Sequence, residues 1–342
     1  MSTKHEPFIS VITPVYNGAK FIAECIESVL AQTYRNFEYI LVNNCSTDHT
    51  LDICQQYARK DSRIHVHDNT VFLDVMVNHN HALSFMSKDS KYVKFVSGDD
   101  WIFPECVDKM VELAEQNPTV GIVACYSIEG KRVLFQGLEY HQKVVNGRDI
   151  CRNTLLGKQP YVFAAPTSLL YRADFARATP TFFPFAEGAP HADVSAVYQV
   201  LQHSDFGFVH QILSFTRVHE QSETSSSFKY GRTNRALLAD MNRFGPVYLT
   251  PEEHALHLRI ALDKYYLWLV AALIENSFSK EFLEMQKSGL RSIGFELSPA
   301  RLLKAAVMRG VELVVTPRVT TSKIAAMFKR KGKIEARGTQ LT

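Results

Sequence analysis

The sequence lacks the marks of several large protein classes. Its six cysteines are scattered, with no CxxC pair, which argues against a zinc site or a disulfide scaffold and indicates a reducing compartment. No GxGxxG follows the first apolar run and GxxxxGK[ST] is absent, so a dinucleotide-binding enzyme or a P-loop ATPase is disfavoured. MSTKHEPFIS at the start has no apolar leader, and the longest apolar run, residues 265–274, is too short to cross a bilayer. We therefore expect a cytoplasmic protein.

The bulk composition is that of an ordinary globular protein. The 342 residues are 46% hydrophobic and 21% charged, enough for one large domain or a domain with an appendage. The net charge of +3 gives no indication of a nucleic-acid partner. Charge is nevertheless uneven, because ten Lys and Arg but only two Glu lie between residue 301 and the end.

The first hundred residues alternate between two patterns. Short apolar runs predict strands, and apolar side chains at one-and-four spacing predict helices between them. This order indicates a parallel sheet with right-handed crossovers, whose ligands bind outside the carboxyl ends of the strands. The predicted strands are 8–13, 37–42, 64–67 and 92–96, and the predicted helices are 19–32, one capped by residues 46–48 and running to about 59, and 74–86.

The rest of the chain is mixed and then helical. Residues 217–227 are polar and Ser-rich, which predicts a mobile loop, and the pattern turns helical from about residue 228. Further strands are predicted at 120–126, 168–171 and 206–215, and helices at 193–202 and 255–274.

Three polar clusters follow predicted strands, at residues 13–17, 43–48 and 97–100. The last lies in KFVSGDDWIFP, where Asp99 and Asp100 are adjacent carboxylates that repel unless a cation or water separates them. A nucleotide needs a stacking face, a group that reads the base edge, an acceptor for the ribose, and a metal or cationic side chains for the diphosphate. The three clusters together contain such residues, with Asp99 and Asp100 for the ribose and the metal.

Two stretches carry a family resemblance. SVITPVYNGAKFIAECIESVLAQTYRNFEYILVNNCSTDHT followed by YVKFVSGDDWIFPE resembles the inverting glycosyltransferases of family 2. The resemblance is strong over residues 8–130, weaker to about 225 and slight beyond. It implies an α/β protein with the A-type glycosyltransferase fold, a Rossmann-like, mostly parallel sheet flanked by helices. The implied catalytic domain is 1–227, with a nucleotide-binding half to about 130 and an acceptor half after it, followed by a helical C-terminal region, 228–342.

The resemblance places four residues at the base. Thr13, Pro14 and Tyr16 would line the base pocket, and Asn44 falls where the family usually has an aspartate that reads the base. An asparagine can accept from uracil N3–H and donate to O4, so a uridine or thymidine donor still fits. The structural alternatives are that Tyr16 is a core aromatic residue and that Asn44 serves only the turn.

The resemblance also gives the two carboxylates separate roles. Asp99 matches the acid that holds the ribose, and Asp100 matches the DxD-like ligand of a Mn²⁺ or Mg²⁺ ion that bridges the diphosphate. Oxygen ligands and retained waters suit these ions. The chain reads SGDD where the family often reads DADD, so one carboxylate is missing. The alternative is that the pair forms a solvated turn.

Sugar transfer also needs a general base. The family places it at the start of a helix beyond the acceptor cleft, where this chain reads HADVS, so Asp193 is the candidate and Glu187 the reserve. An aspartate at this position is also an ordinary helix cap. Arg217 and His219 resemble the family's R-x-H segment, in which His219 would bind the metal or a phosphate, unless it is a surface histidine. The Ser-rich loop after it would be a lid.

These features favour a metal-dependent inverting glycosyltransferase that transfers a sugar from a nucleotide-diphospho-sugar, UDP-sugars favoured, to a glycan or lipid-linked glycan of a surface polysaccharide. The alternative is an inactive nucleotide- or glycan-binding protein on the same scaffold, which the asparagines and the missing acid would explain. A sugar-phosphate nucleotidyltransferase would need a Gly-rich, basic first loop that residues 14–20 do not supply. The basic tail, with apolar residues at helical spacing near residue 302, is a solvated face or a contact with an anionic membrane.

Overall fold

The structure is a computed structural model that divides into two compact units, Met1–His257 and Leu258–Thr342. The boundary falls inside one helix, so the division that the sequence predicted at residue 227 stays a prediction. The structure describes residues 6–159, 163, 165–179, 181–184, 192–219, 232–275 and 279–315.

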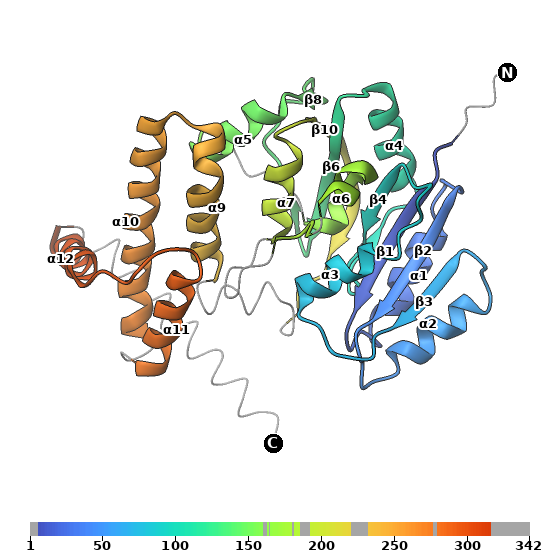
Figure 1. The fold of residues 1–342 in the computed structure, drawn as a ribbon, viewed down its shortest axis with the longest axis horizontal. Helices are drawn as coiled ribbons and strands as arrows, with labels where there is room; N and C mark the ends of the chain where they lie inside the picture. The colour runs from blue at the N-terminus through green and yellow to red at the C-terminus, as the bar shows by residue number, and fades with distance from the viewer. Residues whose placement is uncertain are drawn as a thin grey trace. The chain divides into compact units, whose positions relative to one another are not determined.

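The first unit is built on a single sheet of ten described strands (Figure 1). Their order is β3-β2-β1-β4-β9-β6-β10-β5, with β7 on β6 and β8 on β10. The strands are β1 (Ile9–Val15), β2 (Phe37–Asn43), β3 (Ile64–Asp68), β4 (Tyr92–Phe95), β5 (Trp101–Ile102), β6 (Val120–Glu129), β7 (Arg132–Leu134), β8 (Val144–Val145), β9 (Leu169–Arg172) and β10 (Asp205–Thr216).

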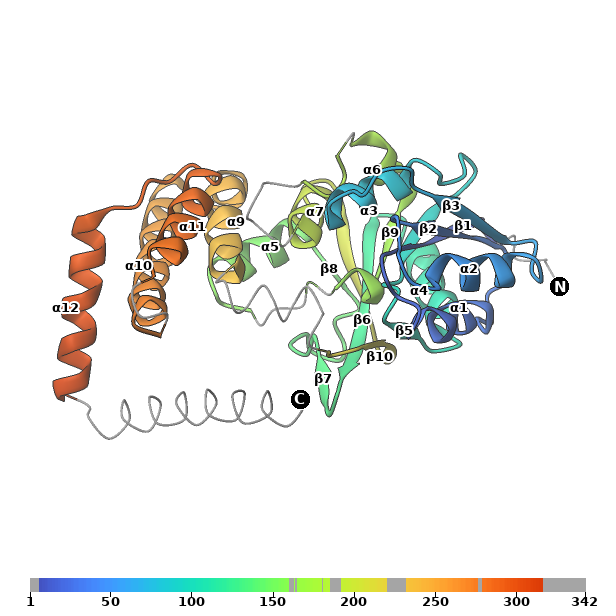
Figure 2. The same cartoon turned by 90° about the horizontal axis from the view of Figure 1, so that it is seen from below.

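Helices cover both faces of this sheet (Figure 2). Apolar side chains of α1, α2 and α4 pack with alternate residues of β1 and β2 in one buried cluster. Helices α3 and α6 contact the sheet at β1, β4 and β9. The bounds are α1 (Ile22–Leu30), α2 (Thr50–Ala58), α3 (Val75–Leu83), α4 (Cys106–Gln116), α5 (Gly147–Leu155), the 3₁₀ turn η1 (Pro166–Ser168), α6 (Ala173–Ala178), α7 (Ala192–Val200), α9 (Arg232–Tyr248), α10 (Pro251–Glu275), α11 (Lys280–Arg291) and α12 (Pro299–Val315).

The strand register brings the polar clusters to one edge. β2, β1 and β4 run parallel, with Ile9 opposite both Phe37 and Tyr92. All seven residues of β1 are buried, as expected for a central parallel strand. Parallel strands end on the same side, so the loops after β1, β2, β3 and β4 meet there. This confirms the predicted parallel arrangement for the first hundred residues.

The sheet departs from all-parallel order after β4. β9 lies between β4 and β6 and runs antiparallel to both, and β10 returns parallel to β6. The strands predicted at 120–126, 168–171 and 206–215 correspond to β6, β9 and β10. The helix predicted after residues 46–48 corresponds to α2, which begins at Thr50. Asp48 supplies the predicted cap, because its Oδ1 accepts from the N–H of Thr50 at 3.0 Å, whereas the side chain of His49 makes no cap bond.

Helices are the only regular elements among the described residues beyond 231, as the sequence predicted. Within the described residues, no helix combines the length and apolar character needed to span a membrane. The six cysteines are all free.

Candidate active site

Two loops at the carboxyl edge of the sheet are bonded to each other. The backbone N–H of Asn17, after β1, donates to Ser46 Oγ at 2.9 Å, and the N–H of Thr47, after β2, donates to Asn17 Oδ1 at 2.8 Å. Asn17 has a φ of 49°, which asparagine tolerates better than most residues. Asp48 accepts from the N–H of Ala19 at 3.1 Å. The two loops therefore form one unit beside the strand ends.

The three residues expected at a base, two in β1 and one directly after it, differ in exposure. Thr13 is fully buried and its hydroxyl shares a 3.0 Å hydrogen bond with the hydroxyl of Tyr39, so this side chain faces the core. Pro14 is buried too, whereas Tyr16 is 49% exposed. The structure thus places only Tyr16 with a side chain open to a ligand, and the base-pocket roles of Thr13 and Pro14 stay predictions.

Asn44 is buried and bonded to the loop that follows β3. Its Nδ2 donates to the carbonyl oxygen of Leu73 at 2.7 Å, and its Oδ1 accepts from the N–H of Leu73 and from Asn69 Nδ2, both at 3.0 Å. The loop between those two contacts presents Phe72, whose ring centroid lies 4.9 Å from that of Tyr16. Phe72 was not predicted as a site residue, although an aromatic residue between two polar segments was a visible signal.

The two adjacent aspartates occupy different environments. Asp99 keeps 32% of its side chain exposed, and its Oδ2 lies 2.9 Å from Nε2 of His219. Asp100 is 5% exposed, with Oδ2 accepting from the Thr167 hydroxyl at 2.7 Å and Oδ1 from the N–H of Arg217 at 2.9 Å. Residues 67 to 120 positions apart in sequence therefore meet here.

The pKa of Asp100 reflects this environment. Burial raises it to about 7, the negative charge of Asp99 adds to that shift, and the hydrogen bonds from Thr167 and Arg217 oppose it. A buried carboxylate beside a second carboxylate is stabilised in its charged form by any cation that reaches it. The repulsion expected from the sequence is thus present in the structure.

Arg217 ties the end of β10 to this pair. Its Nε donates to the carbonyl oxygen of Asp99 at 2.8 Å, and its guanidinium pairs with Glu24 of α1. The same group lies 4.6 Å above the ring of Phe21, close enough for a cation–π contact. The ring of His219 is 5.3 Å from that of Phe21. Arg217 therefore fixes the segment that carries His219.

The candidate base lies on a different element. Asp193 is in the first turn of α7, and its negative charge acts on His79 of α3 and Asp240 of α9. Burial raises the pKa of Asp240 to about 7, the hydrogen bond from Ser195 (2.9 Å) opposes the shift, and the charge of Asp193 adds to it. Asp240 was missed from the sequence. Glu187 and most of the Ser-rich loop lie outside the described residues.

The side chains present fit a divalent cation that the substrate helps to hold. Among the described residues, no three His, Cys, Asp or Glu side chains are grouped to hold a metal ion by themselves. Asp99, Asp100 and His219 offer carboxylate oxygens and one imidazole nitrogen within one cluster. Mg²⁺ is usually held by one or two carboxylates together with substrate phosphates, so a partial site of this kind suits a nucleotide-bound metal.

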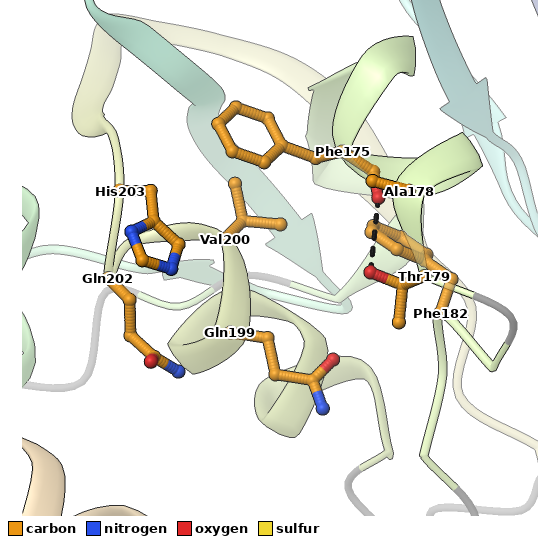
Figure 3. Close-up of a pocket in the computed structure, with 8 residues that line it drawn as sticks. All are labelled: Phe175, Ala178, Thr179, Phe182, Gln199, Val200, Gln202 and His203. Carbon is orange, nitrogen blue, oxygen red and sulfur yellow. Dashed lines mark hydrogen bonds between the residues drawn. The ribbon is translucent and has the colours of Figure 1, made fainter.

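A separate cavity of about 380 Å³ lies between α6 and α7 (Figure 3). Phe175, Phe182 and Val200 give it apolar walls, and the polar side chains of Gln199 and His203 also line it. None of the residues predicted from the sequence for the donor site lines it. The cavity is therefore not the donor site described above.

Residues 10–177 match the family model described as glycosyl transferase family 2. The chain carries a glycosyl transferase family 2 domain. The match includes every predicted donor-site residue as far as Asp100, and also Thr167, whereas Asp193, Arg217 and His219 lie beyond it.

Three curated relatives of this family 2 domain are bacterial proteins. The chain is 33% identical over 158 residues to the putative glycosyltransferase EpsE of Bacillus subtilis, covering 44% of this chain and 56% of that one. It is 36% identical over 130 residues to the putative teichuronic acid biosynthesis glycosyltransferase TuaG of the same species, covering 37% and 49%. With glycosyltransferase GlyA of Streptococcus pneumoniae it shares 32% over 151 residues, covering 42% and 21%. The chain thus spans about half or less of the length of these relatives.

Solved structures show the same fold. TarS 1–349 of S. aureus with UDP-GlcNAc superposes with a TM-score of 0.62 at 18% identity, covering 84% of this chain and 80% of that one. The mannosyltransferase PcManGT of Pyrobaculum calidifontis, in complex with GDP-Man and Mn²⁺, gives 0.54 at 15% identity, covering 94% and 85%. The A-type glycosyltransferase fold expected from the sequence is thereby confirmed.

Proposed function

We propose that this protein is a metal-dependent inverting glycosyltransferase that moves a sugar from a nucleotide-diphospho-sugar to a glycan or lipid-linked glycan acceptor in surface polysaccharide synthesis. The observation that carries the proposal is the cluster of Asp99, Asp100, Arg217 and His219 at the carboxyl ends of parallel strands. Its first two members lie within the family 2 match. The relatives named for teichuronic acid synthesis and the neighbours solved with UDP-GlcNAc and GDP-Man support the substrate class.

In this proposal the chain's residues divide the donor between them. Tyr16 faces the base, Asp99 accepts from the ribose hydroxyls, and Asp100 with His219 holds Mn²⁺ or Mg²⁺. The bound cation would neutralise charge that develops on the departing diphosphate. An imidazole nitrogen is a softer ligand than Mg²⁺ usually takes, which favours Mn²⁺ of the two. Arg217 keeps the Asp99 backbone and the His219 segment together.

Asp193 is the proposed general base. A carboxylate that removes the proton of the acceptor hydroxyl as it attacks the anomeric carbon contributes about 10²–10⁴-fold to the rate. Attack from the face opposite the diphosphate inverts the configuration. The position of Asp193 in the first turn of α7, with part of its surface exposed, supports this role.

Titration calorimetry with UDP, GDP, dTDP and CDP, each with and without Mn²⁺, tests the donor site. We expect one nucleotide to bind tightly and only with metal, and Asp100→Ala to abolish that metal dependence and sugar transfer. If none of the four nucleotides binds to the folded protein, the proposed donor site is wrong. Binding without turnover across donors and acceptors would support the inactive-scaffold alternative.

We also propose that the second unit contacts an anionic membrane surface. Within the second unit, α12 exposes Leu303 (67%), Val307 (59%) and Met308 (43%), and it carries the exposed Lys304. The sequence beyond α12 adds further lysines and arginines. A basic helix with an exposed apolar face binds anionic lipid surfaces, each basic residue contributing about 1 kcal/mol.

Flotation with vesicles of phosphatidylglycerol and phosphatidylcholine tests the membrane contact. The full chain should float with anionic vesicles at low salt, and the Leu303→Asp, Val307→Asp double variant should not. Ile274→Asp, which changes an equally exposed residue of α10, serves as the control. If wild-type protein stays at the bottom at low salt, the membrane proposal is wrong.

A further inference from the structure

The side-chain amide of Asn44 is engaged by the protein itself. Its Oδ1 accepts two hydrogen bonds, from Leu73 N–H and Asn69 Nδ2, and its Nδ2 donates to Leu73 C=O. An amide oxygen has two lone pairs, so none is left for a pyrimidine N3–H. Asn44 is also 3% exposed. In this arrangement the residue cannot read a base edge by accepting from N3–H.

The same contacts hold the loop of residues 69–73 by both ends. The N–H of Asn69 continues the strand ladder by donating to the carbonyl oxygen of Asn43 at 2.9 Å. Cys45 Sγ donates to the carbonyl oxygen of Asn69 at 3.1 Å, and Asn69 Nδ2 also donates to Asn78 Oδ1 at 2.9 Å. The first end of the loop is thus fixed to β2 and α3, and Asn44 fixes the second end at Leu73.

Between these anchors the loop turns apolar side chains outward. Val71 is 67% exposed and Phe72 is 52% exposed. The Phe72 ring meets the half-exposed Tyr16 edge to face, with an interplanar angle of 67°. Two rings in this arrangement form a corner beside the carboxyl ends of β1, β2 and β3. A flat heterocycle can stack on one ring while its edge contacts the other.

We propose that Phe72 forms the second wall of the base site with Tyr16, and that Asn44 acts on the base only by positioning the Phe72 loop. The proposal rests on the donor being a nucleotide, as argued above. It makes Phe72 the residue that contacts the base and Asn44 a positioning residue. Stacking is tolerant of base identity, since every base has a π-face. Asn44 therefore does not decide between uracil and cytosine.

The test measures the binding affinity of UDP and of inorganic pyrophosphate, each with Mn²⁺, by titration or by competition. Pyrophosphate lacks a base and so reports the metal and phosphate contacts alone. Phe72→Ala should weaken UDP binding about 5- to 150-fold and leave pyrophosphate binding unchanged. Phe72→Tyr should restore most of the affinity, because it keeps the flat ring. Val71→Ala is the matched control on the same loop and should bind UDP like the wild type.

Asn44→Asp tests the positioning role. A carboxylate can still accept from the Leu73 N–H but cannot donate to the Leu73 carbonyl, 2.7 Å away, which it repels. We expect Asn44→Asp to weaken the binding of UDP and the binding of CDP by the same factor. In the Asn44→Asp variant, the further substitution Phe72→Ala should reduce UDP affinity by a smaller factor than it does in the wild type. The effects of substitutions that act through one loop are not additive.

The outcomes separate the two proposals. If the wild type binds UDP and Phe72→Ala binds it equally well, the Phe72 role is wrong while the proposed function stands. Equal losses for UDP and pyrophosphate in Phe72→Ala also overturn the inference, because they show a general defect. If Asn44→Asp reverses the preference between UDP and CDP, Asn44 reads the base directly. A folded wild type that binds neither nucleotide overturns both proposals.

Discussion

The ammonium group of Lys94 donates a 2.7 Å hydrogen bond to the carbonyl oxygen of Thr167 inside the core of the first unit. A second bond, of 3.2 Å, goes to the carbonyl oxygen of Leu169. Lys94 is fully buried on β4, and the hydroxyl of Thr167 donates in turn to Asp100. A buried cation thus fixes the backbone of the residue that holds the Asp100 carboxylate.

This relationship predicts that Lys94→Met lowers both stability and metal-dependent nucleotide binding. Two carbonyl oxygens lose their donor, at about 1–3 kcal/mol for each buried group left unpaired, although removing a buried charge returns part of this. Urea unfolding and UDP titration with Mn²⁺ measure the two effects. Lys91→Met, which removes an exposed partner of Glu115, is the control and should change neither. If UDP binding depends on Mn²⁺ equally in Lys94→Met and in the wild type, Thr167 does not need the hydrogen bond from Lys94 to hold Asp100.

Asp193→Asn should separate binding from turnover. The amide cannot take the acceptor proton, so the rate should fall about 10²–10⁴-fold while UDP-sugar affinity stays within a few-fold of the wild type. Initial rates and donor titrations on the same preparation check this. Glu187→Gln is the comparison. Wild-type rates in Asp193→Asn, with loss in Glu187→Gln, would move the base assignment to Glu187.

Asp240→Asn should change how stability depends on pH. Because its pKa is raised to about 7 in the folded protein from about 3.9 in the unfolded chain, Asp240 binds a proton only when folded between these values. The contribution of Asp240 to the free energy of unfolding is therefore fully present below about pH 4. It is lost as the pH rises to about 7, and the loss amounts to up to about 4 kcal/mol. The asparagine keeps an acceptor for Ser195 and removes this loss. Urea unfolding at pH 5 and pH 7.5 should show the variant gaining on the wild type at the higher pH.

Asp174 serves as a control, because its contribution to stability depends on pH in the direction opposite to that of Asp240. Its hydrogen bonds with Arg172 lower its pKa. The pair therefore stabilises the fold at pH values above the unfolded pKa of Asp174, and this stabilisation is lost as the pH falls. Asp174→Asn should accordingly show no gain at pH 7.5. If Asp240→Asn and wild type keep parallel stability curves between pH 5 and 7.5, Asp240 is ionised throughout that range and its assigned environment is wrong.

Gly147→Ala should destabilise the first unit by about 1–3 kcal/mol through overpacking. A Cβ on Gly147, the first residue of α5, would lie 1.9 Å from the carbonyl oxygen of Ser204 and 2.7 Å from that of Leu201. Gly310 in α12 has open space around the same position, so Gly310→Ala should be neutral or stabilise by up to about 1 kcal/mol. Thermal unfolding of both variants checks the contrast, and an unchanged Gly147→Ala would contradict the close packing of α5 on the turn before β10.

Local pattern predicted the elements that repeat a simple period. The β-branched run of β1 and the one-and-four spacing of α1 are visible in the sequence, and both elements lie within a few residues of their expected bounds. The one-and-four spacing of Cys106, Met110 and Ala114 in α4 was equally visible and was missed. The antiparallel insertion of β9 was not predictable, because pairing direction depends on partners far along the chain.

The candidate site was predictable as a set of residues but not as a set of contacts. Adjacent carboxylates after a strand identified Asp99 and Asp100, yet nothing local distinguishes the exposed one from the buried one. That difference comes from Thr167 and from Arg217, which reach Asp100 from 67 and 117 residues away. The clamp that Asn44 places on Leu73 uses backbone groups, which every sequence shares, so no side-chain pattern announces it.

The place of β9 also bears on how the chain is made. β4 and β6 pair with β9 from opposite sides, so each keeps an open edge until residues 169–172 have been synthesised. Open strand edges attract other chains, and domains that form during translation expose them for as long as the missing strand is delayed. Truncated or nascent chains that stop before Leu169 should therefore aggregate, whereas those that include β9 close the gap between the two halves of the sheet.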